Sequence, residues 1–239
     1  MLPAVWRALV ALVALGAASP ATGREVLKAM HDRYAGKWYR TLAFVQYNTA
    51  TGPDGATTHS VWREYLALPG RLRIEPDSGP GRLFAHDSQF VFAGDGAPQA
   101  TAFVHPLMVL GFDVYFDPVA RTVAQLERLG FDLTTVHDDT WDGRPVYVVG
   151  AKSGDVHSRQ FWVDRERLVC VRMLEPGRRD TSTTSDIRFN KYRPLARGWI
   201  SVEMAFLVDG HPRWLEEYGA IQGDLPLGDT LFDPARGKR

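Results

Sequence analysis

The stretch SRQFWVDRERLVCVRMLE, residues 158–175, constrains the fold of this chain more than any other segment. Successive side chains of a β-strand point to opposite faces, and here both faces are apolar. Phe161 and Val163 alternate with Trp162, a polar turn follows over residues 164–167, and Leu168 begins a second apolar strand. A sheet with one face in water alternates apolar and polar residues. This hairpin therefore needs cover, or a ligand, on both of its faces.

Similar short segments with a period of two recur along most of the chain. Turns rich in Gly, Pro and Asp separate them, in a sequence that contains 22 Gly and 15 Pro. Besides the hairpin, the pattern predicts strands within residues 40–50, 58–68, 71–77, 81–87, 88–96, 98–106, 134–151, 184–195, 199–210 and 212–223. The short spacing favours antiparallel neighbours joined by hairpins, as in a β-meander.

One segment before the strands has helical spacing. In residues 24–39, Leu27, Met30 and Tyr34 share one helical face, and Gly36 is a plausible stop. We expect the chain to enter the strand region after this helix.

The middle of the chain also departs from the strand pattern. A helix is predicted near residues 118–129, with Asp117-Pro118 at its start and Gly130 at its end. Residues 106–112 are interpreted as a loop or a short helix. The simplest architecture is mainly β (α+β): one long, strongly curved antiparallel sheet whose concave face is covered by a few helices.

Length and charge bound the functional classes. A chain of 239 residues can form one large all-β domain or two small domains, but no shift in composition suggests a linker. The formal net charge is zero, so nothing global indicates a nucleic-acid partner or an anionic membrane surface. We expect a single domain over residues 24–239 and no nucleic-acid partner.

Residues 1–23 have the pattern of a secretory signal peptide. Arg7 precedes an apolar run from Ala8 to Ala18, and the triplets Ser19-Pro20-Ala21 and Ala21-Thr22-Gly23 are alternative cleavage motifs. A membrane anchor is the alternative, but spanning needs about 20 apolar residues, and this run is shorter. We therefore expect an exported protein.

The sequence lacks the common signatures of catalysis and of cofactor binding. It has no GxSxG, Walker loop or GxGxxG, so we predict no catalytic residue and no cofactor. His137-Asp138-Asp139 is the best local metal candidate, but adjacent strand residues point to opposite faces, which favours a solvated strand end and no metal. An enzyme whose site is assembled from distant residues remains the alternative.

Cys170 is the only cysteine, so no intrachain disulfide can form. Its neighbours Val169 and Val171 indicate a buried strand thiol rather than a nucleophile. No cysteine follows the cleavage region, so the usual attachment site of a bacterial lipoprotein is missing.

Large apolar residues on the predicted strands raise two alternatives. They fill an ordinary core, or one face of the sheet lines an apolar cavity that the few helices cannot fill. On the second interpretation, Arg71 faces solvent, opposite the cavity face of its strand. The ten candidate cavity residues are Phe44, Trp62, Leu72, Ile74, Phe90, Phe92, Phe103, Phe161, Val202 and Met204.

The order of these features resembles the LolA/LolB-like superfamily. Gly143, Tyr147 and Val149 fit its G-x-x-x-Y-x-V strand, and residues 162–168 fit the W-[IV]-D-x-x-x-L hairpin that follows. The LFDP ending, residues 231–234, matches as well. The resemblance spans most of residues 24–235 and implies an unclosed β-barrel of about eleven strands with a helical lid. In such a fold, the inner face of the 158–175 hairpin would line the cavity and its outer face would be partly exposed or covered by loops.

The resemblance also implies a function. It suggests a soluble periplasmic carrier or chaperone that binds a lipid or the acyl chains of a lipoprotein, for traffic to the outer membrane. Its partners would include an inner-membrane donor or an outer-membrane acceptor protein. The alternative within the superfamily is an RseB-like envelope sensor or adaptor, which binds a protein partner and transports nothing.

Overall fold

The computed structural model describes residues 19–93, 97–177 and 180–236. Most of the expected signal peptide, residues 1–18, lies outside the described residues. Within them one antiparallel sheet contains thirteen strands, two more than the resemblance implies, and the sheet is not closed. The strands are β1 (Thr41–Thr51), β2 (Thr57–Ala67), β3 (Arg71–Pro76), β4 (Gly81–Ala85), β5 (Ser88–Phe92), β6 (Gln99–Ala102), β7 (Val136–Trp141), β8 (Arg144–Val149), β9 (Gln160–Asp164), β10 (Cys170–Pro176), β11 (Thr184–Leu195), β12 (Gly198–Val208) and β13 (His211–Gly223).

The expected helices are confirmed. They are α1 (Gly23–Tyr34), α2 (Pro106–Gly111) and α3 (Val119–Arg128), with short 3-10 turns η1 (Asp113–Tyr115) and η2 (Asp229–Phe232). Leu27, Met30 and Tyr34 are all buried on the inner face of α1, as the spacing predicts. Among the described residues, none of the helices has both the length and the apolar character needed to cross a membrane.

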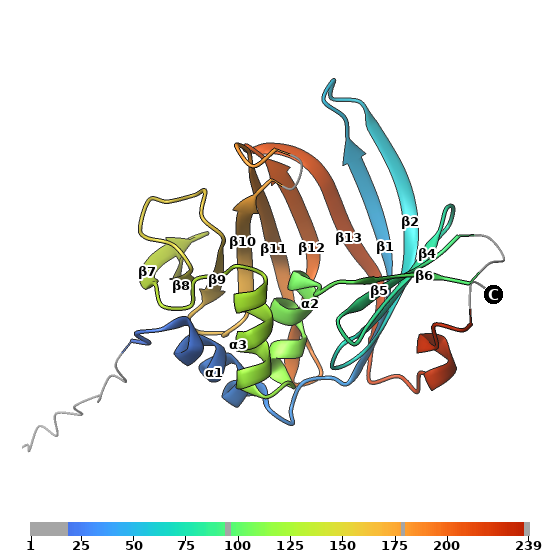
Figure 1. Cartoon of the computed structure of the whole chain (residues 1–239), viewed down its shortest axis with the longest axis horizontal. Helices are drawn as coiled ribbons and strands as arrows, with labels where there is room; N and C mark the ends of the chain where they lie inside the picture. Colours follow the sequence, from blue (N-terminus) through green and yellow to red (C-terminus); the bar gives the residue numbers. More distant parts are fainter. Residues whose placement is uncertain (1–18, 94–96, 178–179, 237–239) are drawn as a thin grey trace, which may run out of the picture.

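The strand order explains where the helices lie. The order is β6-β5-β4-β3-β2-β1-β13-β12-β11-β10-β9-β8-β7, so the first and last strands pair at the centre of the sheet. The two edge strands, β6 and β7, are consecutive in the sequence, and α2, η1 and α3 connect them. This connection must pass from one edge of the curved sheet to the other, and it crosses the concave side (Figure 1).

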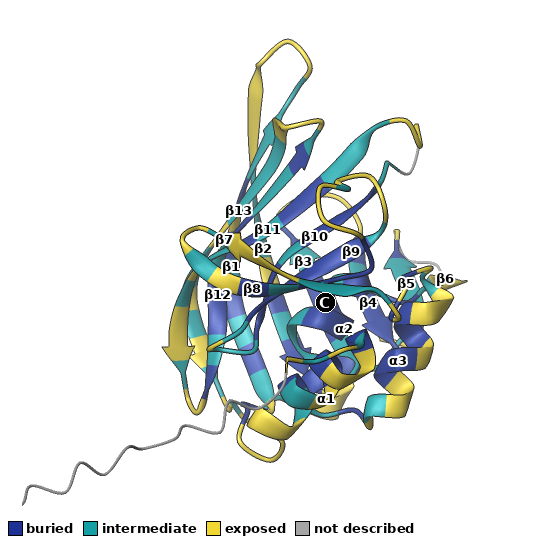
Figure 2. Ribbon diagram, turned by 90° about the vertical axis from the view of Figure 1, so that its left-hand side faces the viewer, coloured by how far each residue is buried: buried dark blue, intermediate teal, exposed yellow. Residues whose placement is uncertain are grey.

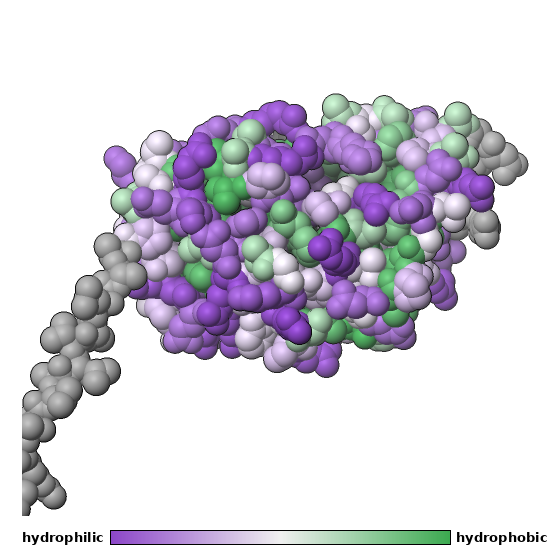
Figure 3. All heavy atoms as spheres, turned by 90° about the horizontal axis from the view of Figure 1, so that it is seen from below, coloured by the Kyte–Doolittle hydropathy of each residue, from purple (hydrophilic) through white to green (hydrophobic). Residues whose placement is uncertain are grey.

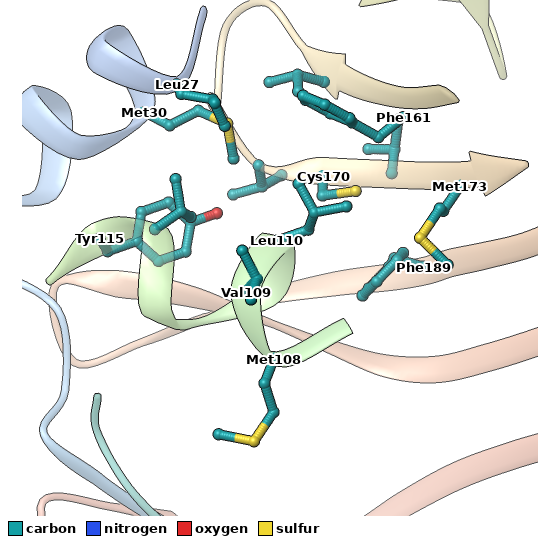
Figure 4. Close-up of a cluster of buried hydrophobic side chains, with 14 of the residues drawn as sticks. Leu27, Met30, Met108, Val109, Leu110, Tyr115, Phe161, Cys170, Met173 and Phe189 are labelled. Carbon is teal, nitrogen blue, oxygen red and sulfur yellow. The ribbon is translucent and has the colours of Figure 1, made fainter. Parts of the chain in front are cut away.

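The helices fill only part of that concave side. The side chains of α1, η1 and α3 pack over β8 to β11, where Phe161 is fully buried and its ring contacts Phe131 edge-on at 5.7 Å between centroids. Figure 2 shows the inner faces of the helices buried, while the far ends of several strands extend beyond them and become exposed. In Figure 4, Leu110, Cys170 and Phe189 belong to one apolar cluster, and Met108 leaves α2 on the opposite side.

The outer face of the hairpin over residues 158–175 is covered by other side chains of the sheet. The Trp141 ring lies edge-on to Trp162 at 5.6 Å, and the Arg172 guanidinium lies 4.3 Å from the Trp141 ring centroid and 4.8 Å from that of Trp162. Asp186 holds this guanidinium through two hydrogen bonds of 2.8 Å. A cation over aromatic rings is favourable, and these side chains leave Trp162 only 8% exposed.

The C-terminal segment covers the convex face of β3 to β5. Phe232 is buried in a small cluster with Phe92, and the Arg71 guanidinium lies 5.0 Å from the Phe232 ring centroid and pairs with Asp229. Arg73 is only 4% exposed. Arg71 lies on the face opposite the cavity, as expected, but its side chain is only 34% exposed, because the tail folds back over this face.

Two acidic residues attach the helical connection to the sheet. Asp87, in the β4–β5 turn, accepts hydrogen bonds from Gln125 and Arg128 of α3, each at 2.8 Å. Asp113 of η1 is buried and accepts the Gly70 N–H at 2.8 Å. Burial, and secondarily the negative charges of Asp117 and Asp87 against the opposing effect of Arg121, raises the pKa of Asp113 to about 7.

Asp113 should make stability depend on pH. Its pKa is about 7 in the folded protein against an ordinary 3.8, so its contribution is fully present below about pH 4 and is lost as the pH rises through 7. Between about pH 5 and pH 8, we expect the free energy of unfolding to fall by about 2–3 kcal/mol less in Asp113→Asn than in the wild type. Urea unfolding of both proteins at each pH measures this; identical losses would contradict it. Asp132→Asn, on an exposed loop, is the control.

Candidate functional site

A cavity of about 810 Å³ occupies the part of the concave side that the helices leave unfilled. Its walls come from β1 to β4, from β10 to β13, and from α2 with the residues on either side of it. This volume lies within the range of small-molecule sites, roughly 300–1,000 Å³. Most of its lining is apolar, including Phe44, Leu66, Leu72, Ile74, Phe84, Phe103, Leu107, Met108, Phe112, Met173, Ile187, Met204 and Phe206. The outer face in Figure 3, by contrast, is mainly hydrophilic with separate apolar areas.

Six of the ten candidate residues line this cavity. They are Phe44, Trp62, Leu72, Ile74, Phe103 and Met204. Alternation places them there, because each lies on a strand, or just after one, in phase with the concave face. The sequence pattern thus locates part of the apolar wall, and the contact of these residues with a ligand stays a prediction.

The other four residues lie elsewhere. Phe161 is under the helices, and Val202 packs against the same main core. Phe90 and Phe92 point to the convex face, where they pack in the cluster under the tail. The register explains why Phe90 and Phe92 face the convex side. Phe90 pairs directly with Leu83, which pairs with Arg73, and Arg73 is on the convex side.

Sequence reasoning missed a group of polar residues on the cavity face. We call Gln46, Asn48, Glu64, Glu216 and Tyr218 the polar wall; they come from β1, β2 and β13. Adjacent strands bring them together, since Gln46 pairs with Trp62 on one side and Tyr218 on the other, and Asn48 pairs with Glu216.

The signal for the polar wall was the period of two. Gln46 is in phase with Phe44, and Glu64 is in phase with Trp62. The neighbouring pair Glu216 and Glu217 divides as alternation requires, since Glu216 lines the cavity and Glu217 is exposed. A carboxyl in phase with buried aromatic residues could thus have been singled out.

Hydrogen bonds hold Glu216 in place. Its two carboxyl oxygens accept the Tyr218 hydroxyl at 2.7 Å and the Trp214 indole N–H at 3.0 Å. Gln46 donates to Asn48 at 2.7 Å. Within the described residues, the Asn48 Nδ2 has no hydrogen-bond partner.

The two acids of the polar wall are poorly solvated. Burial raises the pKa of Glu216 to about 7. Burial first, and then the nearby Glu216 charge, raises the pKa of Glu64 well above its usual value. Burial penalises the charged form of a carboxyl, so the empty cavity favours neutral acids here.

Charged residues at the cavity mouth are already engaged. The Glu175 carboxylate forms an ion pair with Arg159. The His105 imidazole accepts the Met108 N–H at 3.4 Å and so caps α2. The Arg82 guanidinium lies 5.9 Å from the Trp62 ring centroid.

The chemistry considered for other residues is not assembled in the described part of the chain. No group of three or more His, Cys, Asp or Glu there could hold a metal ion. Asp138 and Asp139 are exposed in the middle of the edge strand β7 rather than at a strand end. Cys170 is buried, and burial raises the pKa of its thiol to about 12, which disfavours the thiolate.

Comparison with known proteins gives a likeness of structure rather than of sequence. No protein-family model matches the chain, and no curated protein matches it by sequence. Three solved structures align over nearly the whole fold.

A DUF1329 family protein from Desulfovibrio piger aligns with a TM-score of 0.59 and 12% identity, over 88% of this chain and 95% of that one. A putative outer membrane lipoprotein-sorting protein domain from Vibrio parahaemolyticus gives a TM-score of 0.59 and 12% identity, over 88% and 96% of the two chains. A LolA superfamily protein from Nitrosomonas europaea gives 0.57 and 11%, over 90% and 98%. The curved thirteen-stranded sheet with its helical connection is therefore the LolA/LolB-like fold.

Proposed function

We propose that this protein is a carrier of the cell envelope that encloses the apolar chain of a lipid or of a lipoprotein in its cavity. One observation carries the proposal: about 810 Å³ of largely apolar cavity remains between the sheet and α2. A fold whose helices merely completed a core would fill this space, because protein interiors are close-packed. The names of the similar structures from Vibrio parahaemolyticus and Nitrosomonas europaea, lipoprotein-sorting protein and LolA superfamily, support the same function.

The physical chemistry of such a carrier needs no covalent step. Each methylene moved from water into an apolar site gains about 0.8 kcal/mol, so a chain of about 16 carbons gains on the order of 12 kcal/mol. Ordering the chain and the protein consumes part of this gain. The remainder is enough to keep an acyl chain out of water during transfer between two membranes.

The carrier would act in the periplasm after export. Thr22 caps α1 and accepts the Glu25 N–H at 3.3 Å, while Glu25 reaches back to the Thr22 N–H at 3.1 Å. The Gly23 N–H donates to the Leu133 carbonyl at 2.8 Å. Removal of Thr22 and Gly23 would break both attachments, which favours the earlier of the two cleavage motifs.

Filling the cavity should abolish uptake without unfolding the protein. We expect Met204→Trp to weaken binding of a fluorescent fatty acid by at least about tenfold, since the new indole occupies the space of the chain. Arg63→Trp places the same residue on the exposed face of β2 and should bind normally. Fluorescence titration measures both affinities. Equal affinities of the two variants, with intact melting curves, would refute the cavity as the binding site.

Processing should leave the cap of α1 intact. We expect the mature chain, recovered from the periplasm of an expressing bacterium, to begin at Thr22, after cleavage of the Ser19-Pro20-Ala21 motif. The mass of the intact protein measures this directly. A chain that begins at Arg24, or one that is not cleaved at all, would contradict the expectation.

A further inference from the structure

The polar wall is out of place in a cavity that serves apolar chains alone. Gln46, Asn48 and Glu64 are 1%, 2% and 6% exposed. Buried polar groups in native proteins almost always have hydrogen-bond partners, and exceptions need an explanation. A ligand that supplies the missing partners is one such explanation.

Glu64 has the largest unmet capacity. Its carboxyl lines the cavity and makes no hydrogen bond or ion pair to any residue that the structure describes. Glu216, in contrast, already accepts from Tyr218 and Trp214. The free acceptor of the wall is therefore a carboxyl that faces the cavity, which a donor or a cation on a ligand would satisfy.

The charges around this carboxyl favour a cation. Glu64 and Glu216 act on each other electrostatically, and no ion pair joins either of them to a basic residue in the described part of the chain. Arg82, the arginine of the cavity lining that the structure describes, lies over the ring of Trp62 instead. A second anion, such as a carboxylate or phosphate, would add repulsion at this point.

Aromatic rings surround the same position. The rings of Phe44 and Tyr218 stack at 4.4 Å between centroids, and those of Trp62 and Trp214 lie 5.4 Å apart. Aromatic faces attract ammonium groups, and carboxyls among aromatic residues are a recurrent setting for amines. Carboxyl acceptors and ring faces thus point to one ligand chemistry.

We propose that the polar wall binds the cationic amine of an amphiphile whose apolar chain fills the rest of the cavity. The inference rests on the carrier function proposed above and assigns its substrate class. The amine would donate to Glu64 and Glu216, which lose their protons as it binds. Burial of both acids then lowers the stability of the empty protein and contributes selectivity when the ligand is present.

Three surfactants with the same chain test the inference: dodecylamine, dodecanol and dodecanoic acid, each below its micellar concentration. Binding to the mature protein is followed by the change in its tryptophan emission, to which Trp62 and Trp214 at the polar wall contribute, and by calorimetry at about pH 8. We expect dodecylamine to bind at least about tenfold more tightly than the alcohol or the acid, as a charged hydrogen bond in a partly buried site allows.

Glu64→Gln and Glu216→Gln should each remove this preference, measured as the ratio of the dodecylamine affinity to the dodecanol affinity of the same variant. Glu217→Gln is the matched control, because Glu217 follows Glu216 on β13 and is exposed on the other side. Removal of a buried acid should not unfold the protein, and melting curves check this. If the glutamine variants keep the amine preference, the proposal is overturned.

The outcomes separate the two proposals. Equal binding of all three surfactants, or tighter binding of the acid, overturns the amine site but leaves the carrier function standing. Failure of all three to bind overturns both. Loss of the amine preference in Glu64→Gln and Glu216→Gln, with the preference kept in Glu217→Gln, supports the assignment.

The affinity for the amine should also decrease as the pH is lowered, because protons then compete with the amine for the two acids. From about pH 8 to about pH 5 we expect a loss of at least about tenfold. The other titratable or charged groups that line the cavity are Tyr218, Arg82, His105, Glu175 and Asp180. The double variant E64Q/E216Q measures the share of these other groups; an equal pH dependence in that variant would overturn the assignment.

Discussion

The pairing of β1 with β13 at the centre of the sheet determines the rest of the molecule. It places the two ends of the strand region side by side and leaves β6 and β7 as the two edges. Because those edge strands follow each other in the sequence, one connection must span the concave side. That connection is too short to fill the concavity: α2 has 6 residues and α3 has 10. An open, partly covered cavity therefore follows from chain connectivity rather than from any local feature.

The attachment of the connection to the sheet is polar, and this sets it apart from the core. Asp87 of the sheet accepts a hydrogen bond from Gln125 of α3. Asp113 of η1 accepts one from the Gly70 N–H, in the turn between β2 and β3. Aromatic packing holds the other end of the cover, where the ring of Trp38, just after α1, stacks on that of Tyr115 of η1 at 3.9 Å between centroids. Burial penalises the charged form of a carboxyl, and protonation removes its charge, so these contacts depend on pH, whereas aromatic packing does not. The attachment of the cover therefore depends on pH at its polar end rather than over β8 to β11.

Local sequence patterns predicted the elements well and their partners poorly. Helical spacing located α1 and α3, and alternation located the strands with their two faces. Phe90 and Phe92 alternate correctly, yet they face the tail, because register with Arg73 and Leu83 decides which face is concave. Phe161 is likewise on the concave face, but it is covered by the segment after α3, where Phe131, 30 residues earlier in the sequence, contacts its ring. These outcomes depend on contacts between distant segments, which a period of two does not encode.

The polar wall shows the same limit from the other side. Its residues were visible as polar positions in phase with apolar ones, but alternation alone does not say that three strands bring them to one place. Each buried acid costs stability, because desolvation penalises its charge, and an apolar residue of similar size would pack there with less cost. Folding gives no reason to keep Glu64 and Glu216 beside each other. If the cavity holds an apolar chain, as proposed, these two buried acids are positions whose cost to folding a selective ligand contact would explain.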